Sequence, residues 1–384
     1  MEKTLANQYQ DVLKNKGYYG IESTYEELFG QEEKKECYTF LNDHFECGGK
    51  KTALIKALGN KWDIEMLQGS MRCVHMVSLY LLGRSLEDCI GEAVKKILAN
   101  HVEAFRNPDS QENWYDFRHI WYLITLSHDI TYCQEKLSVE KDKFDNIMKT
   151  GHTIFDYKMQ DGTYFCPRFS KELIYKYEKY RANKGSNDHG ILAGSILFDS
   201  LYNEYEKKLD GKKMIIDESL VYWRRDQLDQ LAYISDAIIG HNIWVPDLDK
   251  EKEYEENGLQ ELIDPNGQKR LNFNQYPLHF LLCLLDTLEP IKRFCNEEYI
   301  EKGEKRMASD EVLRSISIQR EEAKEGKRSI KIEWEKNLES VNKKVFDLWL
   351  NGIDGLINWL DVTVNRNDME NHKCRVIEFN SNVY

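Results

Sequence analysis

One stretch constrains the fold of this chain more than any other, the segment FRHIWYLITLSHDITY from Phe117 to Tyr132. Its apolar residues recur at helical spacing, which predicts a buried helix whose last turn carries the adjacent pair His128–Asp129. Burying ionisable groups is costly unless they find a counter-charge or coordinate a metal. Taken alone, the pair could instead be a hydrogen-bonded cap at a helix end. The rest of the chain favours the metal interpretation.

Four further segments have helical periodicity, and each carries one metal-competent residue on or beside its apolar face. In chain order these residues are His75, His189, His241 and Asp286. An unpaired aspartate such as Asp286, within the apolar run PLHFLLCLLDTLEPIKRF, would be expensive to bury, whereas a metal ligand would not. If these groups were unrelated core residues, each would need its own satisfying partner. A shared metal site is therefore the simpler interpretation.

The periodicity also predicts where these helices begin and end. His75 lies within a predicted helix at 68–83, and His241 lies within one at 226–244. His189 is in the first turn of a helix that Ser186, Asn187 or Asp188 can cap, and Gly190 and Gly194 allow a neighbouring helix to approach closely. Residues 277–294 are expected to form one continuous central helix, opened by Pro277.

The order His, His-Asp, His, His, Asp, each on its own helix, resembles the HD-domain superfamily of metal-dependent phosphohydrolases. The local contexts are similar as well: MRCVHMVSLYLLG resembles the first-ligand helix of that family and LSHDITY resembles its HD signature. NDHGILAG is similar to the second-metal helix, and LLCLLDTLEPIKR is similar to the closing Asp helix. The resemblance covers roughly residues 60–295 and implies an HD-domain-like helical bundle.

The resemblance implies a site with two divalent transition-metal ions. His75, His128, Asp129 and Asp286 would hold the first ion, and His189 and His241 would hold the second, with Asp129 bridging. Imidazole and carboxylate ligands suit Fe, Mn or Zn, and Mg is a further candidate. In such a site a metal-bound hydroxide attacks the phosphorus of a phosphate ester.

Cationic side chains would stabilise the phosphoryl oxygens in this chemistry. Together with Asp129, the expected catalytic residues are Arg72, one turn before His75, Lys136, shortly after the His-Asp pair, and Arg293. Arg293 is expected either to hold Asp286 or to bind a substrate phosphate. Three weaker candidates for phosphate contacts are Arg118, Arg181 and Lys184.

Two other functions stay open at this point. HD-like folds with the same ligand order include oxygenases with a diiron pair, similar to inositol oxygenase, and a non-catalytic HD module could sense a nucleotide or bind a partner. Phosphohydrolysis is favoured because it is the commoner chemistry among HD proteins and because basic residues lie near the motif. The expected substrate is a small phosphorylated molecule, a nucleotide by default. The GYP signature associated with cyclic di-GMP hydrolysis does not occur in the sequence.

The charge, hydropathy and cysteine content of the sequence limit the partners and the cell compartment that we expect. The chain has 66 acidic and 53 basic residues and a net charge of −13, so long nucleic acids are not expected to be its ligands. The sequence has no apolar run of about 18 residues and no signal-peptide core in MEKTLANQYQ, so we expect a cytoplasmic protein without a membrane segment. Nine scattered cysteines without a CxxC pair fit reduced thiols.

The predicted fold class is mainly α, with a small C-terminal α+β appendage. Residues 1–58 would form an N-terminal helical extension to which no chemistry is assigned, and residues 59–297 would form the catalytic helical domain. An acidic insertion near 246–275 is expected to be solvent-exposed, and 297–328 is expected to be an exposed helix or linker. The appendage would carry a helix at 345–360 and two or three strands, at 330–334, 362–364 and 375–379. It is expected to pack on the helical domain or to mediate self-association, so a homo-oligomer is left open.

Overall fold

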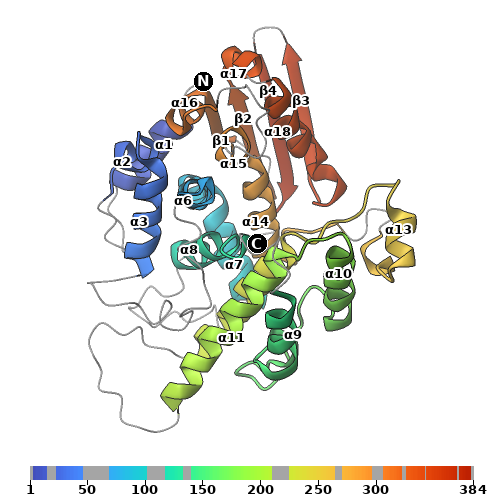
Figure 1. The fold of residues 1–384 in the computed structure, drawn as a ribbon. Coiled ribbons are helices and arrows are strands. Elements are labelled where there is room, and N and C mark those ends of the chain that lie inside the picture. Colours follow the sequence, from blue (N-terminus) through green and yellow to red (C-terminus); the bar gives the residue numbers. More distant parts are fainter. Residues whose placement is uncertain are drawn as a thin grey trace.

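The protein is described here from a computed structural model that is mainly helical, with an antiparallel sheet in its C-terminal region (Figure 1). The predicted fold class is confirmed. The structure describes residues 3–14, 23–45, 69–101, 117–132, 140–209, 225–263, 270–295, 306–321, 326–341, 343–369 and 372–381.

The helices before the sheet are α1 (Leu5–Lys14), α2 (Tyr25–Phe29), α3 (Glu33–Phe45), α6 (Met71–Ser85), the π-helix η3 (Glu87–Gly91), α7 (Glu92–His101), α8 (Phe117–Ser127), α9 (Glu140–Thr150), α10 (Lys171–Asn183), α11 (His189–Leu209), α12 (Arg225–Gly240), α13 (Glu251–Glu256), α14 (Pro277–Leu288), α15 (Ile291–Phe294) and α16 (Ser309–Ser315). Short 3-10 turns, η6 (Ile154–Asp156) and η7 (Gln260–Leu262), lie between them. Helices α17 (Lys336–Val341) and α18 (Lys343–Gly355) and the turn η9 (Leu356–Asn358) follow within the sheet region.

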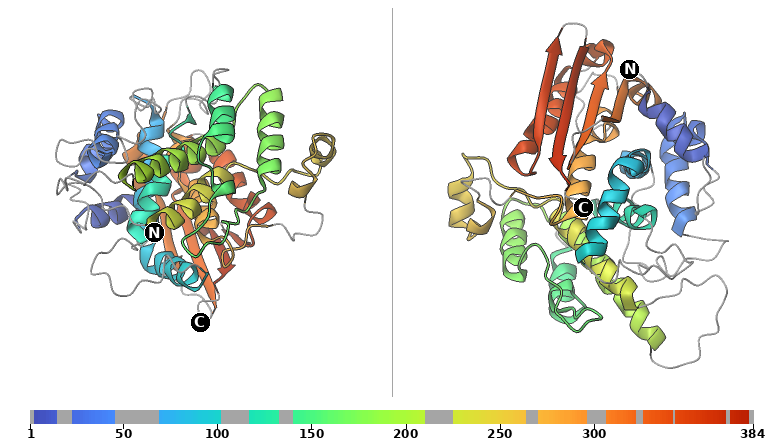
Figure 2. Two further views of the ribbon diagram at one scale, coloured as in Figure 1. Left: turned by 90° about the horizontal axis from the view of Figure 1, so that it is seen from below. Right: turned by 180° about the vertical axis from the view of Figure 1, so that it is seen from behind.

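Helices α6, α8, α12 and α14 pack against one another at the centre of the molecule, and α11 lies along α12. Helix α6 has an almost uniformly apolar sequence, and for this reason it is buried along nearly its whole length. The predicted close approach of α11 is confirmed, because a Cβ added to Gly190 would lie 2.8 Å from Cε1 of His241 and one added to Gly194 would lie 2.6 Å from Cγ1 of Ile239. Figure 2 shows helices α1–α3 and helix α13 on opposite sides of this central group.

Two predicted helices end earlier than their apolar patterns suggest. Helix α8 ends at Ser127, so the His128–Asp129 pair lies in the turn that follows it. Helix α12 ends at Gly240, one residue before His241. In both places the apolar spacing continues for a few residues beyond the last helical hydrogen bond, and for this reason periodicity alone overextends the helix.

The predicted continuous helix at 277–294 is wrong, because it is divided into α14 and α15. Glu289, between them, has an extended backbone with ψ 117°. The cause is Pro290, which lacks a backbone N–H and disfavours the helical conformation of the residue before it. The break turns the chain back towards the end of α14.

The N-terminal helices contact both the central helices and the C-terminal region. Helices α1 and α3 pack on α6, and α1 also packs on α16. The hydroxyl of Tyr25 donates to Oδ1 of Asp310 at 2.9 Å, and Oγ of Ser317 donates to the carbonyl of Lys3 at 2.8 Å. A single hydrophobic cluster runs through all three predicted parts of the chain. The division into separate domains stays a prediction.

The sheet has the strand order β1-β2-β4-β3 and is antiparallel throughout. Its strands are β1 (Ile316–Glu321), β2 (Lys327–Trp334), β3 (Thr363–Met369) and β4 (His372–Asn380). Ile330 pairs with Ile377, and Trp334 at the end of β2 packs its ring against Phe346 and Trp349 of α18. The three predicted strands correspond to β2, β3 and β4.

Strand β1 and helix α16 correct the prediction of an exposed linker at 297–328. Val312, Leu313, Ile316 and Ile318 are buried. Their burial depends on the pairing of β1 with β2 and on contact with α1, which are tertiary interactions that a charge-rich local sequence does not reveal. Residues 297–305 and 322–325 of this prediction lie outside the described residues.

The acidic insertion predicted at 246–275 is partly buried where the structure describes it, and residues 264–269 lie outside the described residues. Tyr254, Leu259 and Leu262 are buried, and the backbone of Leu271 bonds to that of Trp359 and Asp361. This segment therefore connects the helical region to the C-terminal region. Among the described residues, no helix is long and apolar enough to cross a membrane.

Candidate metal centre

His75, His128 and Asp129 form a first buried cluster, and Asp129, His189 and His241 form a second. Within each cluster one ligand-type atom from each residue lies within 4.8 Å of the others. Asp129 belongs to both, so the clusters are adjacent. They are built from the side of α6, the turn after α8, the first residue of α11 and the residue after α12. The structure thus brings together five of the side chains that the sequence predicts as metal ligands.

Asp129 is fully buried, with Arg72 on one side of its carboxylate and His189 on the other. Nη1 of Arg72 lies 2.9 Å from Oδ2, and Nε2 of His189 lies 3.1 Å from Oδ1. Burial opposes the charged carboxylate, but the neighbouring His128 and Arg72 outweigh burial and hold the pKa of Asp129 well below its usual value. The carboxylate is therefore ionised, which is the form that binds a metal.

Arg72 is itself fixed by an aromatic ring. Its guanidinium carbon lies 3.4 Å from the centroid of the Tyr132 ring, and that ring packs edge-on against His189 at 5.2 Å. Because Arg72 is 4% exposed and already bonded to Asp129, it orients the shared carboxylate.

His128 and His241 present the same nitrogen to the centre. In each, Nδ1 bonds to the backbone carbonyl three residues earlier, Thr125 at 2.8 Å and Ile238 at 2.6 Å. A carbonyl only accepts, so Nδ1 carries the proton and Nε2 keeps its lone pair when the ring is neutral. Nε2 of both residues is buried with no hydrogen-bond partner among the described residues. A buried nitrogen lone pair held in this way fits a metal ligand.

The charge state of His241 agrees with this assignment. Burial, with the nearby His189 and His128, lowers the pKa of His241 to about 3. The ring is thus neutral at physiological pH, and a neutral imidazole is the ligand form.

His75 is oriented by a carboxylate rather than by a carbonyl. Its Nδ1 lies 2.6 Å from Oε2 of Glu289, and Glu289 also accepts from Oγ of Ser78 at 2.6 Å and from the backbone N–H groups of Ile291 and Lys292. Burial lowers the pKa of His75, but hydrogen bonds to Asp286 and Glu289 outweigh it and raise the pKa. A carboxylate–histidine pair behind a ligand nitrogen is a common feature of metal sites.

Asp286 lies beside the first cluster. Its Oδ1 is 3.0 Å from Nε2 of His75 and 3.7 Å from Nε2 of His128. Nζ of Lys292 bonds to both of its oxygens, at 2.9 and 2.7 Å. Burial acts against ionisation here, but Lys292 and the two histidines outweigh it and keep the pKa of Asp286 well below its usual value.

The three cationic residues predicted to be catalytic differ in where the structure places them. Arg72 faces the centre but bonds to Asp129, and Lys136 lies outside the described residues. Arg293 is in α15, where its backbone N–H donates to the carbonyl of Pro290, and the cation that the structure places on Asp286 is the neighbouring Lys292.

Two of the weaker candidates are committed to ion pairs. Nε of Arg118 lies 2.9 Å from Oε1 of Glu87, and Lys184 pairs with Glu253. Arg181 lies in the last turn of α10, and no ligand of either cluster comes from that helix.

Lys292 and Glu289 are site residues that the sequence did not identify, since Arg293 was the residue expected to hold Asp286. Both depend on the break at Pro290, which returns Lys292 to Asp286 across six positions of the chain. The available signal was the proline itself, since a proline in an apolar helical run marks a break. No protein-family model matches the chain, and no curated protein or solved structure matches it significantly.

Proposed function

We propose that this chain is a metal-dependent phosphohydrolase similar to the HD-domain superfamily, with two divalent metal ions and a small nucleotide as its substrate. The observation that carries the proposal is the pair of buried clusters that share Asp129. A carboxylate between two groups of imidazoles can bridge two adjacent metal ions.

The residues fit this assignment by their chemistry. His75, His128 and Asp129, with Asp286 beside them, would hold the first ion, and His189, His241 and Asp129 would hold the second. Nitrogen and carboxylate ligands suit Fe, Mn or Zn. Two such ions, when bound, would lower the pKa of a shared water and stabilise the charge that develops on a phosphoryl group.

The protein's own groups would orient the ligands. Arg72 holds Asp129, Glu289 holds His75, and two backbone carbonyls hold His128 and His241. Lys292 places an ammonium group at Asp286, at the more accessible edge of the centre, where its side chain is 15% exposed.

The proposal is tested by elemental analysis of the protein purified without added metal, followed by incubation with Mn²⁺ or Fe²⁺ and a nucleotide panel while free phosphate is measured. About two transition-metal ions per chain and phosphate release are expected. The double variant His128→Ala, Asp129→Ala should lose both. Asp236→Asn is the matched control, because Asp236 is a buried aspartate of α12 that belongs to neither cluster, and it should keep both.

Removing a ligand from one cluster only makes the test sharper. His241→Ala should reduce the bound metal from about two ions to about one, because the cluster of His75, His128 and Asp129 stays complete. Two irons per chain with oxygen consumption and no phosphate release would replace the hydrolase by an oxygenase. No bound metal under any of these conditions would refute both.

A further inference from the structure

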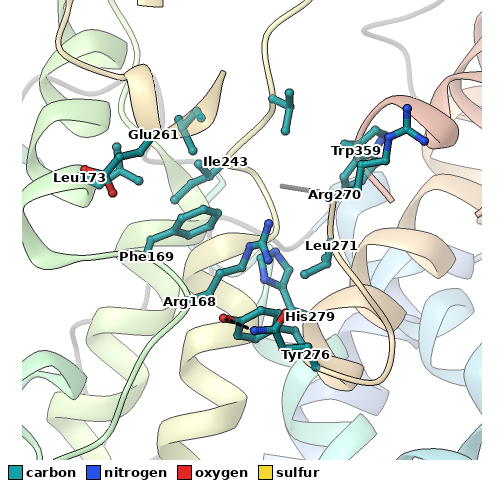
Figure 3. Close-up of a pocket in the computed structure, with 13 residues that line it drawn as sticks. Arg168, Phe169, Leu173, Ile243, Glu261, Arg270, Leu271, Tyr276, His279 and Trp359 are labelled. Atoms are coloured by element: carbon teal, nitrogen blue, oxygen red, sulfur yellow. Dashed lines mark hydrogen bonds between the residues drawn. The ribbon is translucent and has the colours of Figure 1, made fainter. Parts of the chain in front are cut away.

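A pocket of about 270 Å³ lies between the helical region and the C-terminal region (Figure 3). Its walls come from helix α10 and the segment before it, the segment after α12, the turn η7, residues 270–276, helix α14 and the residue after η9. None of the six predicted metal ligands lines it. Its volume is close to the lower end of the range for small-molecule sites, so it would admit a ligand of modest size.

Two arginines give this pocket a positive character. The guanidinium carbon of Arg168 lies 5.0 Å from the ring centroids of both Phe169 and Tyr276, so it is flanked by aromatic rings. Arg270 lies on another wall, beside Trp359 (Figure 3). It is exposed, and no hydrogen bond or ion pair joins its side chain to another described residue. Two guanidinium groups at one small pocket favour an anionic ligand, and phosphate and carboxylate match their geometry.

A buried ring nitrogen also lines the pocket. His279 is 4% exposed, and its Nδ1 has no hydrogen-bond partner among the described residues. Buried polar atoms are nearly always satisfied, so this nitrogen is a candidate acceptor for a hydrogen-bond donor in the pocket. Burial, with the nearby Arg168 and His241, holds the pKa of His279 well below its usual value, so the ring is neutral.

The remaining walls suit a flat ligand with a hydrogen-bond donor. The rings of Phe169, Tyr276 and Trp359 offer faces for stacking, and Glu261 places an acceptor on the wall opposite Arg270 (Figure 3). We infer that the pocket is a second binding site for a small planar anion of the nucleoside monophosphate class. The phosphate would contact Arg270, the base would stack on the rings, and an exocyclic amine would donate to Glu261.

The position of the pocket connects it to the metal centre. His279 packs directly on Gly240, since a Cβ added there would lie 2.2 Å from Cε1 of the ring. The next residue is His241 of the second cluster. The site is nevertheless built without any metal ligand, so its occupation does not depend on the proposed hydrolase.

The inference is tested by isothermal titration of the full chain with adenosine monophosphate after dialysis against a chelator, which removes metal-dependent binding. Saturable binding is expected, and Arg270→Glu should weaken it by about tenfold or more because it replaces a phosphate contact by a repulsive charge. Arg320→Glu is the matched control, since Arg320 is an exposed arginine of β1 outside the pocket. Trp359→Leu should weaken binding through loss of stacking.

Three results would overturn the inference: no binding of adenosine monophosphate at millimolar concentration, binding that Arg270→Glu leaves unchanged, or binding that the double variant His128→Ala, Asp129→Ala abolishes in the chelated protein. If inorganic phosphate binds as tightly as adenosine monophosphate, the inference that the ligand has a planar base is overturned as well. A failed phosphatase assay would not bear on these outcomes, because no metal is present in this experiment.

Discussion

Asp129 and Asp236 are both buried, yet their carboxyl groups respond to burial in opposite ways. His128 and Arg72 hold the pKa of Asp129 well below its usual value. Burial dominates at Asp236 and raises its pKa to about 7, although the backbone N–H of Arg168 donates to it at 3.1 Å. A buried aspartate therefore says little about function until the charges around it are known.

The raised pKa of Asp236 predicts a pH-dependent stability. Its unfolded-state pKa is near 3.8, so the folded protein keeps a proton that the unfolded chain releases as the pH rises. The contribution of Asp236 to the free energy of unfolding is greatest below about pH 4. It decreases by on the order of 4 kcal/mol as the pH rises to about 7. Asp236→Asn removes the dependence.

The Asp236→Asn protein should thus have a higher thermal unfolding midpoint than wild type, and the difference should be larger at pH 8 than at pH 5. Other titrating groups cancel in this comparison because both proteins carry them. Equal differences at the two pH values would contradict the assignment.

The candidate ligand residues can be identified from the sequence because each is a polar interruption of an apolar helical pattern. His75 and Asp286 are examples, and the structure brings both to the centre. The residues that hold the ligands were less accessible to sequence analysis. The carbonyl of Thr125 has no side-chain signal, and Lys292 reaches Asp286 only because the chain turns at Pro290.

At the scale of elements, α6 and α8 approach closely at Gly83. A Cβ added to Gly83 would lie 1.9 Å from Nε1 of Trp121, so the glycine makes room for the indole of the helix that leads to His128–Asp129. Gly352, in α18, has only an ordinary contact in the same position, 3.7 Å from Cγ2 of Thr287.

These two glycines predict opposite effects of the same substitution. Gly83→Ala should lower the free energy of unfolding by more than about 1 kcal/mol, because the large ring of Trp121 has to move in a packed core. Gly352→Ala should raise the free energy of unfolding by about 0.5–1 kcal/mol through helix propensity. Thermal denaturation measures both, and a Gly83→Ala protein as stable as wild type would contradict the packing described here.

Elements with strong internal periodicity were predicted well, and those that depend on partners were not. Helices α6 and α11 begin within a few residues of their predicted starts, and Asp188 caps α11 through the backbone N–H of Ile191. Strand β1 was missed because the burial of Ile316 and Ile318 depends on strand β2 and helix α1.

At the scale of the whole molecule, a chain of hydrogen bonds joins the N-terminal helix α1 to the candidate metal centre. The hydroxyl of Tyr9 lies 3.1 Å from Oγ of Ser78, Ser78 donates to Glu289 at 2.6 Å, and Glu289 holds His75. Residues 1–58 had no assigned chemistry from sequence, because no local motif indicates a contact across this separation in the chain.

This network predicts that Ser78→Ala weakens metal binding without touching a ligand. Loss of the donor to Glu289 should loosen His75 and reduce metal affinity by about tenfold or more, the usual effect of changing a residue behind a ligand. Ser200→Ala is the control, since Ser200 is a buried serine of α11 whose hydroxyl has no partner among the described residues. Competition with a chelating dye measures the affinity, and equal values for the two variants would exclude a role for the network.

His128 and His241 each take their orientation from the last carbonyls of the helix that they follow. Their positions are thus set by the number of residues in α8 and α12, since one inserted residue would rotate the imidazole by about 100° around the helix axis. We therefore expect that an insertion or deletion inside either helix would displace the imidazole, whereas the connections between elements can change in length without this effect. The geometry of the centre thus depends on the lengths of α8 and α12 as well as on the identity of the histidines.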